Sequence, residues 1–550
     1  MERRVRLPEA AERNIVAAGL GVSDEFEQGV AASAPGNETA ARRPPKGVEE
    51  RRREDRRGIG SLAPRARDTC HLGRPVCRVF IDGVRLGRVA SIGGEASEPQ
   101  LSRAPGRGIE EGMCTCHSEL YGKRRRAFLD AIAAKDEDAI AVFASAPVFT
   151  RNNDVEHDYR QDSDLFYLTG FAEPGTVLVL SAKEKTSTMF VRPRDPERET
   201  WDGPRAGVDG VKVHFGADAA FTIDKLTDEL PKLFQDKKRL YYRLGLNRSF
   251  DDKVIEAVDR ARARAKLGYS WPVEIVDPGT ILHEMRLFKS AEDLASMRRA
   301  ADITAEAHIR AMKSTKPGMH EFQVEAMLLE TFRMHGSERP AYGSIVGSGN
   351  NATILHYRQN NRKMEQGELL LIDAGCEYDY YASDVTRTFP VGAKFTREQQ
   401  AIYELVLDAQ EAGIEKTRKN STLEQIHAAC VDVITRGLVK LGLLKGDIDQ
   451  LMKDEAHKPF FMHKTSHWLG MDVHDVGNYY VGGKARALEP GMVLTVEPGI
   501  YISKDNDKVA PEWRGIGVRI EDDILVTDGD PENLTKQIPK TVSELQAACA

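Results

Sequence analysis

Histidines and aspartates are concentrated in one short stretch of the chain, MHKTSHWLGMDVHDVG, at residues 462–477. The stretch holds three imidazoles and two carboxylates, with small or apolar residues between them. Such side chains ligate divalent metals, and imidazoles also transfer protons near neutral pH. Alone, the stretch fits either a metal and acid/base site or a polar loop. The choice depends on whether carboxylates elsewhere complete a coordination shell.

Two aspartates lie in a predicted β-hairpin over residues 368–391. The apolar run LLLI precedes Asp373, and the polar residues EYDYY separate it from SDVTRTF, which contains Asp384. A turn centred on Tyr378 and Asp379 would place the two aspartates opposite each other, with Cβ atoms roughly 5 Å apart. Ionised carboxylates that close repel each other unless a cation or proton lies between them. A surface hairpin is the alternative, but the apolar run favours a buried pair.

Two glutamates occur in similar apolar contexts. Glu497 stands in LTVEPGIY, and Glu521 stands in GVRIEDD, two residues after Arg519. An acid inside an apolar strand is costly to bury unless it is paired or bound to a metal. Each alone is more often a salt-bridged structural acid, but together with the aspartates and the histidine-rich loop they indicate a carboxylate-dominated site. Oxygen ligands with a single imidazole suit ions such as Mn²⁺, and bridging carboxylates would hold two metals about 3.5–4 Å apart.

Helix and strand periodicities place these residues after an ordered N-terminal region. Between residues 113 and 280, short apolar runs such as AIAVFAS and TVLVLSA predict buried strands, with amphipathic helices around them. A boundary follows near DPGTILHEMRLFKS, where Ser290 and Asp293 form a capping-box-like helix start. Residues 281–546 then alternate helices with antiparallel-looking strand groups. We therefore expect an α+β protein whose first domain is a mixed α/β unit.

Length and composition limit the class of protein. A chain of 550 residues is too long for one hydrophobic core, and 41% apolar and 30% charged residues indicate a globular protein. No apolar run reaches about eighteen residues, so no membrane span is expected. The net charge of −7 argues against nucleic acid as the main partner. The seven scattered cysteines suit a reducing compartment, and we expect the cytoplasm.

The first 112 residues differ in composition from the rest. They are rich in arginine, contain segments such as EERRREDRRG and APGRG, and lack sustained periodicity. Such a composition buries too little apolar surface to offset chain entropy, so we expect a disordered or low-complexity extension. Its unusual arginine content also suggests that the native protein starts at Met113 and that the upstream segment is a translated leader.

The quoted segments resemble a known family. LIDAGCEYDYYASDVTRTFPV, HKTSHWLGMDVHDVG, TVEPGIY and GVRIEDD are similar to the metal-ligand segments of aminopeptidase P, in the pita-bread metallopeptidase group. The likeness extends over nearly all of residues 118–540 and includes YRQDSDLFYLTGF and SIVGSGNNATILHY. It implies a creatinase-like α/β domain at 113–280, a pita-bread catalytic domain at 281–546, and a homo-oligomer, either a dimer or a tetramer.

Carried over position by position, the resemblance assigns roles to individual residues. The implied ligands of two divalent ions, with Mn²⁺ expected, are Asp373, Asp384, His467, Glu497 and Glu521. Asp384 and Glu521 would bridge the ions. The implied catalytic residues are His356, His463, His474, Glu497 and Arg519, with Arg519 holding Asp384 in position. The implied substrate-binding residues are Asp154, Tyr342 and Trp201, and the last is expected to reach an active site, its own or that of a neighbouring subunit. Lys484 stands where an arginine is expected, and it receives no role.

The implied activity is release of the N-terminal residue from peptides with proline in second position. A hydroxide shared by two metal ions would attack the peptide, and Glu497 would pass a proton to the leaving nitrogen. The main alternative is prolidase, which has the same ligands but takes Xaa-Pro dipeptides. Methionine aminopeptidase usually lacks so large an N-terminal domain, while creatinase-type and non-catalytic relatives lack the metal ligands that are intact here.

Overall fold

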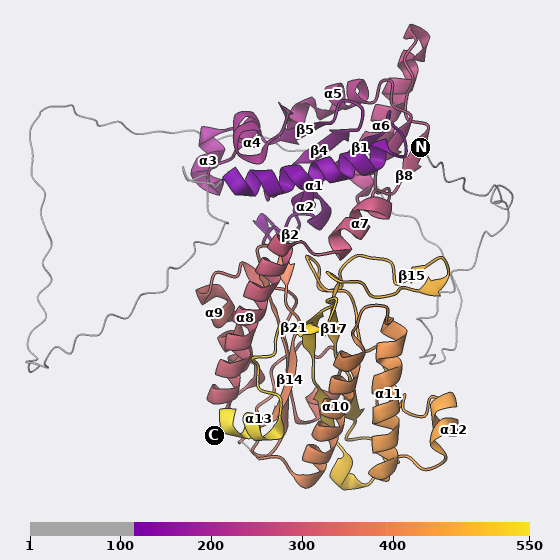
Figure 1. Ribbon diagram of the computed structural model, residues 1–550. Coiled ribbons are helices and arrows are strands. Elements are labelled where there is room, and N and C mark those ends of the chain that lie inside the picture. The colour runs from indigo at the N-terminus through magenta and orange to yellow at the C-terminus, as the bar shows by residue number, and fades with distance from the viewer. Residues whose placement is uncertain (1–114, 393) are drawn as a thin grey trace, which may run out of the picture. The chain divides into compact units, whose positions relative to one another are not determined.

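The computed structural model describes residues 115–392 and 394–550 (Figure 1). The expectations for residues 1–112 and for a start at Met113 lie outside this part of the chain. Within it, no helix combines the length and the apolarity that crossing a membrane requires.

A six-stranded mixed sheet forms the centre of the N-terminal region. Its strand order is β6-β5-β4-β1-β7-β8. Strand β4 runs antiparallel to both of its neighbours, β1 and β5, whereas β5 pairs with β6, and β1 with β7, in parallel. The strands are β1 (Ile140–Ala144), β4 (Val177–Ser181), β5 (Thr186–Val191), β6 (Ala219–Thr222), β7 (Arg239–Tyr241) and β8 (Glu274–Val276).

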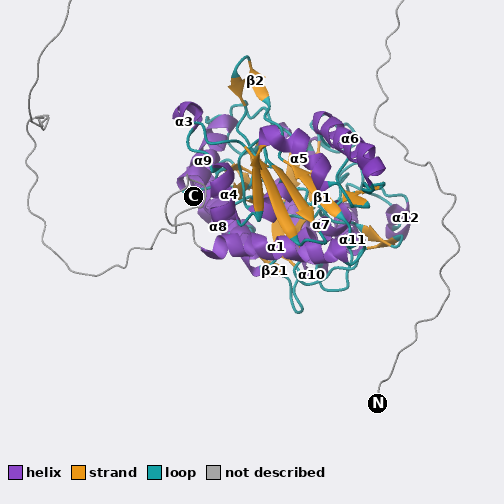
Figure 2. Cartoon of the chain, turned by 90° about the horizontal axis from the view of Figure 1, so that it is seen from above, coloured by secondary structure: helices purple, strands orange, loops and turns teal. Residues whose placement is uncertain are grey.

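Helices cover both faces of this sheet because its strands are apolar on both sides. On β1, Ala141 and Phe143 pack in one core cluster with α1 and α2, whereas Ile140 and Val142 pack in another with α5 and α6. Figure 2 shows the strands between α1 and α5. The helices are α1 (Thr115–Ala133), α2 (Ser163–Thr169), α3 (Pro196–Asp202), α4 (Gly207–Phe215), α5 (Leu226–Leu233) and α6 (Arg248–Arg262). The predicted α/β unit is therefore confirmed.

Helix pairs alternate with strand groups in the second region. Helix α8 packs on α9, and α10 packs on α11, and each pair precedes a group of strands. The predicted capping box of Ser290 and Asp293 opens α8 and is confirmed, and Thr396 and Thr422 open α10 and α11 in the same way. The helices are α7 (Gly279–Leu287), α8 (Ala291–Ser314), α9 (Glu321–Met334), α10 (Arg397–Lys416), α11 (Leu423–Lys440), α12 (Ile448–Lys453) and α13 (Val542–Ala548).

Antiparallel strands carry the predicted acids at their ends. The groups are β10-β11-β14, β13-β12-β9, β17-β20-β21 and β18-β19, which confirms the predicted α+β class. The strands are β9 (Arg339–Pro340), β10 (Ile345–Ser348), β11 (Leu369–Asp373), β12 (Cys376–Tyr378), β13 (Tyr381–Ala382), β14 (Thr386–Pro390), β17 (Val493–Val496), β18 (Gly499–Ile502), β19 (Ile516–Arg519), β20 (Asp522–Leu525) and β21 (Glu532–Asn533). In Figure 1, β14, β17 and β21 lie near α8 and α10.

The register of the aspartate hairpin differs from the prediction. Asp373 pairs with Thr386, not with Asp384. The reason is the turn, which centres on Asp379 and Tyr380, two residues with positive φ between paired tyrosines. Two consecutive residues with positive φ form the tight turn that suits twisted hairpins. Because the turn centre moves by one residue, the residue paired with each hairpin position moves by two along the chain. Asp384 therefore stays on the face that sequence periodicity predicted for it.

Candidate metal centre

All five predicted metal ligands line one cavity. This cavity, of about 490 Å³, also exposes Tyr342, His356 and His474. The ligand set is Asp373, Asp384, His467, Glu497 and Glu521. They come from the end of β11, the segment before β14, the loop over 462–477, the β17–β18 turn and the β19–β20 turn. Residues more than a hundred positions apart therefore meet at one point.

Three of these residues have the spacing of a metal site. Ligand atoms of Asp384, His467 and Glu521 all lie within 4.8 Å of one another. The Nε2 atom of His467 is 3.5 Å from a carboxylate oxygen of Asp384 and 3.6 Å from one of Glu497. Asp373 is linked to Asp384 through the hydroxyl of Tyr342, which contacts both carboxylates. The donors are therefore arranged around a common centre.

The imidazole of His467 is oriented by the backbone around it. Its Nδ1 lies 3.0 Å from the carbonyl oxygen of Trp468 and donates a hydrogen to it, which directs Nε2 toward the acids. The backbone N–H of Thr495 on β17 donates to the carbonyl of His467 (3.0 Å). Trp468 is fully buried and holds this part of the loop against the core. The sequence therefore presents a preoriented nitrogen donor.

Arg519 is paired with Asp373, which corrects the expectation that it would hold Asp384. Its Nη2 donates to Asp373 (2.5 Å), its Nη1 to the hydroxyl of Tyr501 (2.9 Å), and its Nε to the hydroxyl of Thr386 (3.1 Å). Thr386 in turn donates to Glu521 (2.7 Å). Thr386, which lies opposite Asp373 in the hairpin register, therefore contacts both Arg519 and Glu521.

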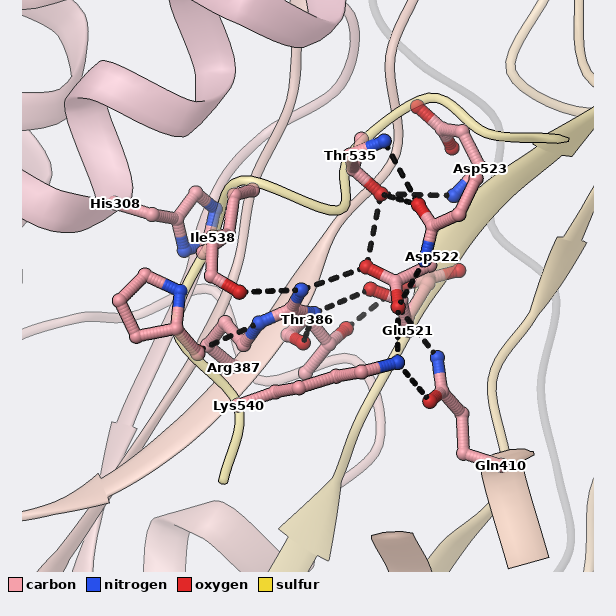
Figure 3. A network of polar contacts seen from close by, with 12 residues as sticks. His308, Thr386, Arg387, Gln410, Glu521, Asp522, Asp523, Thr535, Ile538 and Lys540 are labelled. Atoms are coloured by element: carbon pink, nitrogen blue, oxygen red, sulfur yellow. Dashed lines mark hydrogen bonds and ion pairs between the residues drawn. The ribbon is translucent and has the colours of Figure 1, made fainter. Parts of the chain in front are cut away.

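A buried polar network lies behind Glu521 (Figure 3). The next residue, Asp522, accepts hydrogen bonds from Arg387 (2.6 Å), Gln410 (2.8 Å) and Lys540 (3.0 Å). Arg387, fully buried, also donates to the carbonyl of Glu521 (2.6 Å). The residue after that, Asp523, accepts from the backbone N–H of Asp384. Of these three consecutive acids, the first lines the cavity, the second belongs to the network behind it, and the third contacts the backbone of Asp384, the other predicted bridging ligand.

Protonation of the acids reflects their crowding. Burial raises the pKa of Glu497 to about 7, and burial followed by the charge of Asp384 raises the pKa of Glu521 well above its usual range. Burial also raises the pKa of Asp373, against the lowering effect of Arg519. Burial disfavours the charged form of His467, but its hydrogen bond to Asp384 and the nearby acids raise its pKa to about 9.

This donor set fits divalent cations. Carboxylates that crowd around one cavity must share protons or a cation, and oxygen donors with one imidazole are typical ligands of hard and borderline ions. The hydroxyl of Tyr342 and the guanidinium of Arg519 occupy outer positions, where they neutralise and orient Asp373. The assignment of the four acids and His467 as metal ligands stays a prediction, to which the cavity geometry adds support.

The three predicted outer histidines differ in their surroundings. His463 donates from Nδ1 to the carbonyl of Lys464 (2.8 Å), and its Nε2 lies 2.9 Å from the hydroxyl of Tyr501. Burial lowers the pKa of His463 to about 3, so it is a neutral imidazole. The ring of His474 packs edge-on against that of His467, with centroids 4.5 Å apart. His356 lines the cavity wall.

Two predicted substrate-binding residues do not line this cavity in the chain as described. Asp154 is exposed on the turn between β2 (Thr150–Asn152) and β3 (Val155–Glu156), a hairpin that projects from the N-terminal region in Figure 2. Trp201 lies near the end of α3 with 85% of its side chain exposed. The third, Tyr342, contacts Asp373 and Asp384.

Several residues that organise the site were not singled out from the sequence. The signal for Asp522 and Asp523 was present, since both follow Glu521 in an apolar strand, where an acid must find a partner. Arg160 belongs to the segment YRQDSDLFYLTGF, and it lines the cavity together with Glu377, to which it donates a hydrogen bond (2.7 Å). Arg387 gave no local signal, because its partner lies 135 positions away.

Comparison with known proteins identifies the relatives of this chain. The family described as "Metallopeptidase family M24" matches residues 295–528, and "Aminopeptidase P, N-terminal domain" matches residues 121–241. The chain is 44% identical over 438 residues to Xaa-Pro aminopeptidase of Escherichia coli (strain K12), covering 79% of this chain and 98% of that protein. It is 33% identical over 444 residues to human Xaa-Pro aminopeptidase 3, covering 78% and 85%.

Solved structures show the same relationship. The structure of Pseudomonas aeruginosa aminopeptidase PepP matches with a TM-score of 0.77 and 51% identity, covering 78% of this chain and 98% of that chain. Zn-substituted Escherichia coli aminopeptidase P in complex with product matches with a TM-score of 0.76 and 43% identity, with the same coverage.

The fold and the acidic cavity are therefore those of a metallopeptidase, and the chain belongs to metallopeptidase family M24. Within that family it is a member of the aminopeptidase P group, because both the N-terminal and the peptidase regions match. The expected pita-bread architecture and the expected enzyme class are confirmed.

Proposed function

We propose that this chain removes the N-terminal residue from peptides whose second residue is proline. The observation that carries the proposal is the convergence of four acids and a preoriented imidazole, His467, on one cavity. Two divalent ions bound by this set would lower the pKa of a shared water and polarise the scissile carbonyl. By resemblance Asp384 and Glu521 would bridge them, with Asp373, His467 and Glu497 completing the shells.

The residues of the chain would handle protons and charge around the substrate. Glu497 would receive a proton on its carboxylate and transfer it to the leaving nitrogen of proline. His356 or His474 would donate a hydrogen bond to the oxygen of the scissile carbonyl as negative charge develops there. His463 would act through Tyr501, which also contacts Arg519, so its role would be to hold that pair in place.

Selectivity for proline would come from shape. The nitrogen of proline in a peptide is tertiary and carries no hydrogen. The site therefore does not require a hydrogen-bond acceptor for the scissile amide. A wall shaped to fit the proline ring would be sufficient, and the residues that line the cavity include Tyr342, Ile345 and Val473.

Further properties belong to the same proposal. We expect Mn²⁺ as the bound ion, the cytoplasm as the compartment, peptides as partners without nucleic acid or membrane, and a dimer or tetramer as the assembly. We also propose domain limits at 113–280 and 281–546, in accord with the sheet that ends at Val276 and the helix α7 that begins at Gly279. Asp154 and Trp201 would contribute to substrate binding only in such an assembly.

The test is cleavage of a peptide panel by protein loaded with Mn²⁺, Zn²⁺ or Co²⁺ after chelation. Release of alanine from Ala-Pro-Ala, without release from Ala-Ala-Ala, is the expected result. The variant His467→Ala should lose bound metal, measured by atomic emission, together with activity. Full activity in this variant would contradict the proposal, and cleavage of Ala-Pro but not Ala-Pro-Ala would identify prolidase activity instead.

A further inference from the structure

Arg358 holds a guanidinium at the candidate site that is free for a ligand. It lines the same cavity as the acids, two residues after His356, and its side chain is exposed. Its Cδ, Nε and Nη1 atoms lie 3.7–3.8 Å from the position that a Cβ on Gly343 would take. Gly343 follows Tyr342, whose hydroxyl contacts Asp373 (2.5 Å). The stem of the side chain therefore rests on backbone next to the predicted metal ligands.

Across residues 115–392 and 394–550, Arg358 forms no hydrogen bond or ion pair. The two other arginines of the cavity wall are paired. Arg160 donates from Nε to Glu377 (2.7 Å), and Arg339 contacts the second oxygen of the same carboxylate. Arg160 also donates to the carbonyl of Met471 (2.7 Å). Both guanidiniums are thus engaged within the protein, whereas that of Arg358 is not.

The acids of the cavity wall do not neutralise Arg358. Glu377 is shared by Arg160 and Arg339, and Asp472 is paired with Arg286 (2.8 Å). The remaining acids of the cavity are the predicted metal ligands, whose charge bound cations would balance. Arg358 is therefore a positive charge without a counterpart in a cavity that is otherwise compensated.

The direction of a bound peptide follows from its charges. The free amino group of an aminopeptidase substrate is positive and lies one residue from the scissile bond, so it is attracted to the acid-rich part of the cavity. The chain beyond proline must then leave toward the opening. Two residues after the scissile carbonyl span about 7 Å in extended conformation. A carboxylate in this part of the substrate is a suitable partner for an exposed guanidinium on the cavity wall.

We infer that Arg358 binds a carboxylate located directly after proline in the substrate. Two sources carry this chemistry: the free C-terminus of an Xaa-Pro-Xaa tripeptide, and an aspartate or glutamate side chain at the third position of a longer peptide. Arg358 is thus a specificity-determining residue that favours short or acidic substrates. This inference rests on the proposed function, because it assigns a substrate class to the same cavity.

The expected effect is on substrate binding. An exposed ion pair between arginine and a carboxylate changes affinity roughly 1.5- to 5-fold, and the guanidinium can bind both carboxylate oxygens at once. The contact forms equally in the ground state and the transition state, so it lowers KM and leaves kcat unaltered. High salt should reduce it, because exposed charges are screened.

Two pairs of substrates separate the sources of the carboxylate. The first pair is Ala-Pro-Ala as the free acid and as the C-terminal amide. The second is Ala-Pro-Glu-Ala-Ala-amide and Ala-Pro-Gln-Ala-Ala-amide. For each pair, the ratio of kcat/KM is measured with Mn²⁺-loaded wild type, Arg358→Gln and Arg358→Lys. The control Arg436→Gln removes an arginine of equal charge from the exposed face of α11, outside the cavity.

Wild type should prefer the free acid or the glutamate peptide roughly 1.5- to 5-fold. In Arg358→Gln this ratio should fall toward one, in Arg358→Lys it should be intermediate, and in Arg436→Gln it should equal that of wild type. An unchanged ratio in Arg358→Gln, or an equal loss on both members of each pair, would overturn the inference while leaving the proposed function intact. Failure of wild type to cleave any of the peptides would overturn the proposed function, and the subsite with it.

Discussion

The pairing of Arg519 with Asp373 decides how one predicted ligand is held. Both side chains are almost fully buried, and the guanidinium also contacts Tyr501 and Thr386. Burial is unfavourable for the charge of Arg519, but Tyr501 and the acids around it keep its pKa well above the usual value. A charged guanidinium in this position orients Asp373 and offsets part of the negative charge that would otherwise accumulate in the cavity.

Replacing Arg519 with methionine should therefore destabilise the protein more than an ordinary buried substitution does. Removing one partner of a buried ion pair leaves an uncompensated charge, which costs about 3–5 kcal/mol. Urea denaturation of metal-free wild type and Arg519→Met measures the difference in the free energy of unfolding. The control Arg298→Met breaks an exposed pair with Glu532 and should cost less than about 1 kcal/mol. Equal costs for the two variants would contradict this view of Asp373.

Strand β20 and the turn before it link the predicted bridging ligands to the rest of the fold. Asp522 faces Arg387 and Lys540 (Figure 3). Glu521 lines the cavity, and Asp523 accepts the backbone N–H of Asp384. Burial opposes ionisation of Asp522, but Arg387 and then Lys540 lower its pKa well below the usual range. The network thus fixes the backbone that carries Glu521.

The variant Arg387→Met should weaken metal binding without touching a predicted ligand. Arg387 donates to the carbonyl of Glu521, and loss of an outer partner typically reduces metal affinity about 10- to 100-fold. Isothermal titration with Mn²⁺ measures this change. Adding Lys540→Met in a double variant removes the remaining cation beside Asp522, so its melting temperature should fall below that of Arg387→Met. Wild-type affinity in Arg387→Met would show that the network has no influence on the site.

A second ion cluster joins helix α2 to the loop that carries His474. Arg286 on α7 donates to Asp164 (2.7 Å), Asp472 (2.8 Å) and Asp475 (2.7 Å), so it bridges the N-terminal region and both flanks of His474. Burial opposes ionisation of Asp164, but its hydrogen bond to His283 and the charge of Arg286 lower its pKa to about 2. The contact between the two regions is therefore sensitive to acid.

Asp164 should stabilise the protein above about pH 4 and lose that effect as the pH falls toward 2. The sign follows from linkage, because the unfolded aspartate, with a pKa of about 3.9, binds a proton before the folded one does. The difference in unfolding free energy between wild type and Asp164→Asn should reach about 2–3 kcal/mol at neutral pH and shrink below about pH 4. Urea denaturation across this range tests it. The exposed Asp209→Asn control should show no such trend, and a constant difference for Asp164→Asn would refute the prediction.

At the scale of the whole molecule, exposed apolar side chains on the N-terminal region need an explanation. Trp201 is 85% exposed and Phe149 is 65% exposed, and Phe149 precedes the hairpin that bears Asp154. Large apolar groups at the surface often mark contacts with another chain. They are consistent with the proposed homo-oligomer, in which Trp201 would reach the cavity of a neighbouring subunit.

Trp201→Ala should lower kcat/KM on Ala-Pro-Ala while the metal content stays unchanged. An aromatic contact contributes about 0.5–1.5 kcal/mol beyond its buried area, which corresponds to roughly a 2- to 12-fold loss. Light scattering gives the mass of the assembly, and atomic emission gives the metal content. The exposed Val213→Ala serves as control and should behave as wild type. A monomeric wild type, or full activity in Trp201→Ala, would remove the proposed role of this residue.

The donor residues and their elements could be read from the sequence because their signals are local. Apolar flanks identified Asp373 and Glu497 as acids aimed at a core, and spacing located the helices and the capping box of Ser290. Only the tertiary structure decided which charges are paired. Asp373 pairs with Arg519 from 146 positions away, and Arg387 meets Asp522 from 135 positions away. Such partners are chosen by packing between distant strands, about which periodicity and composition carry no information.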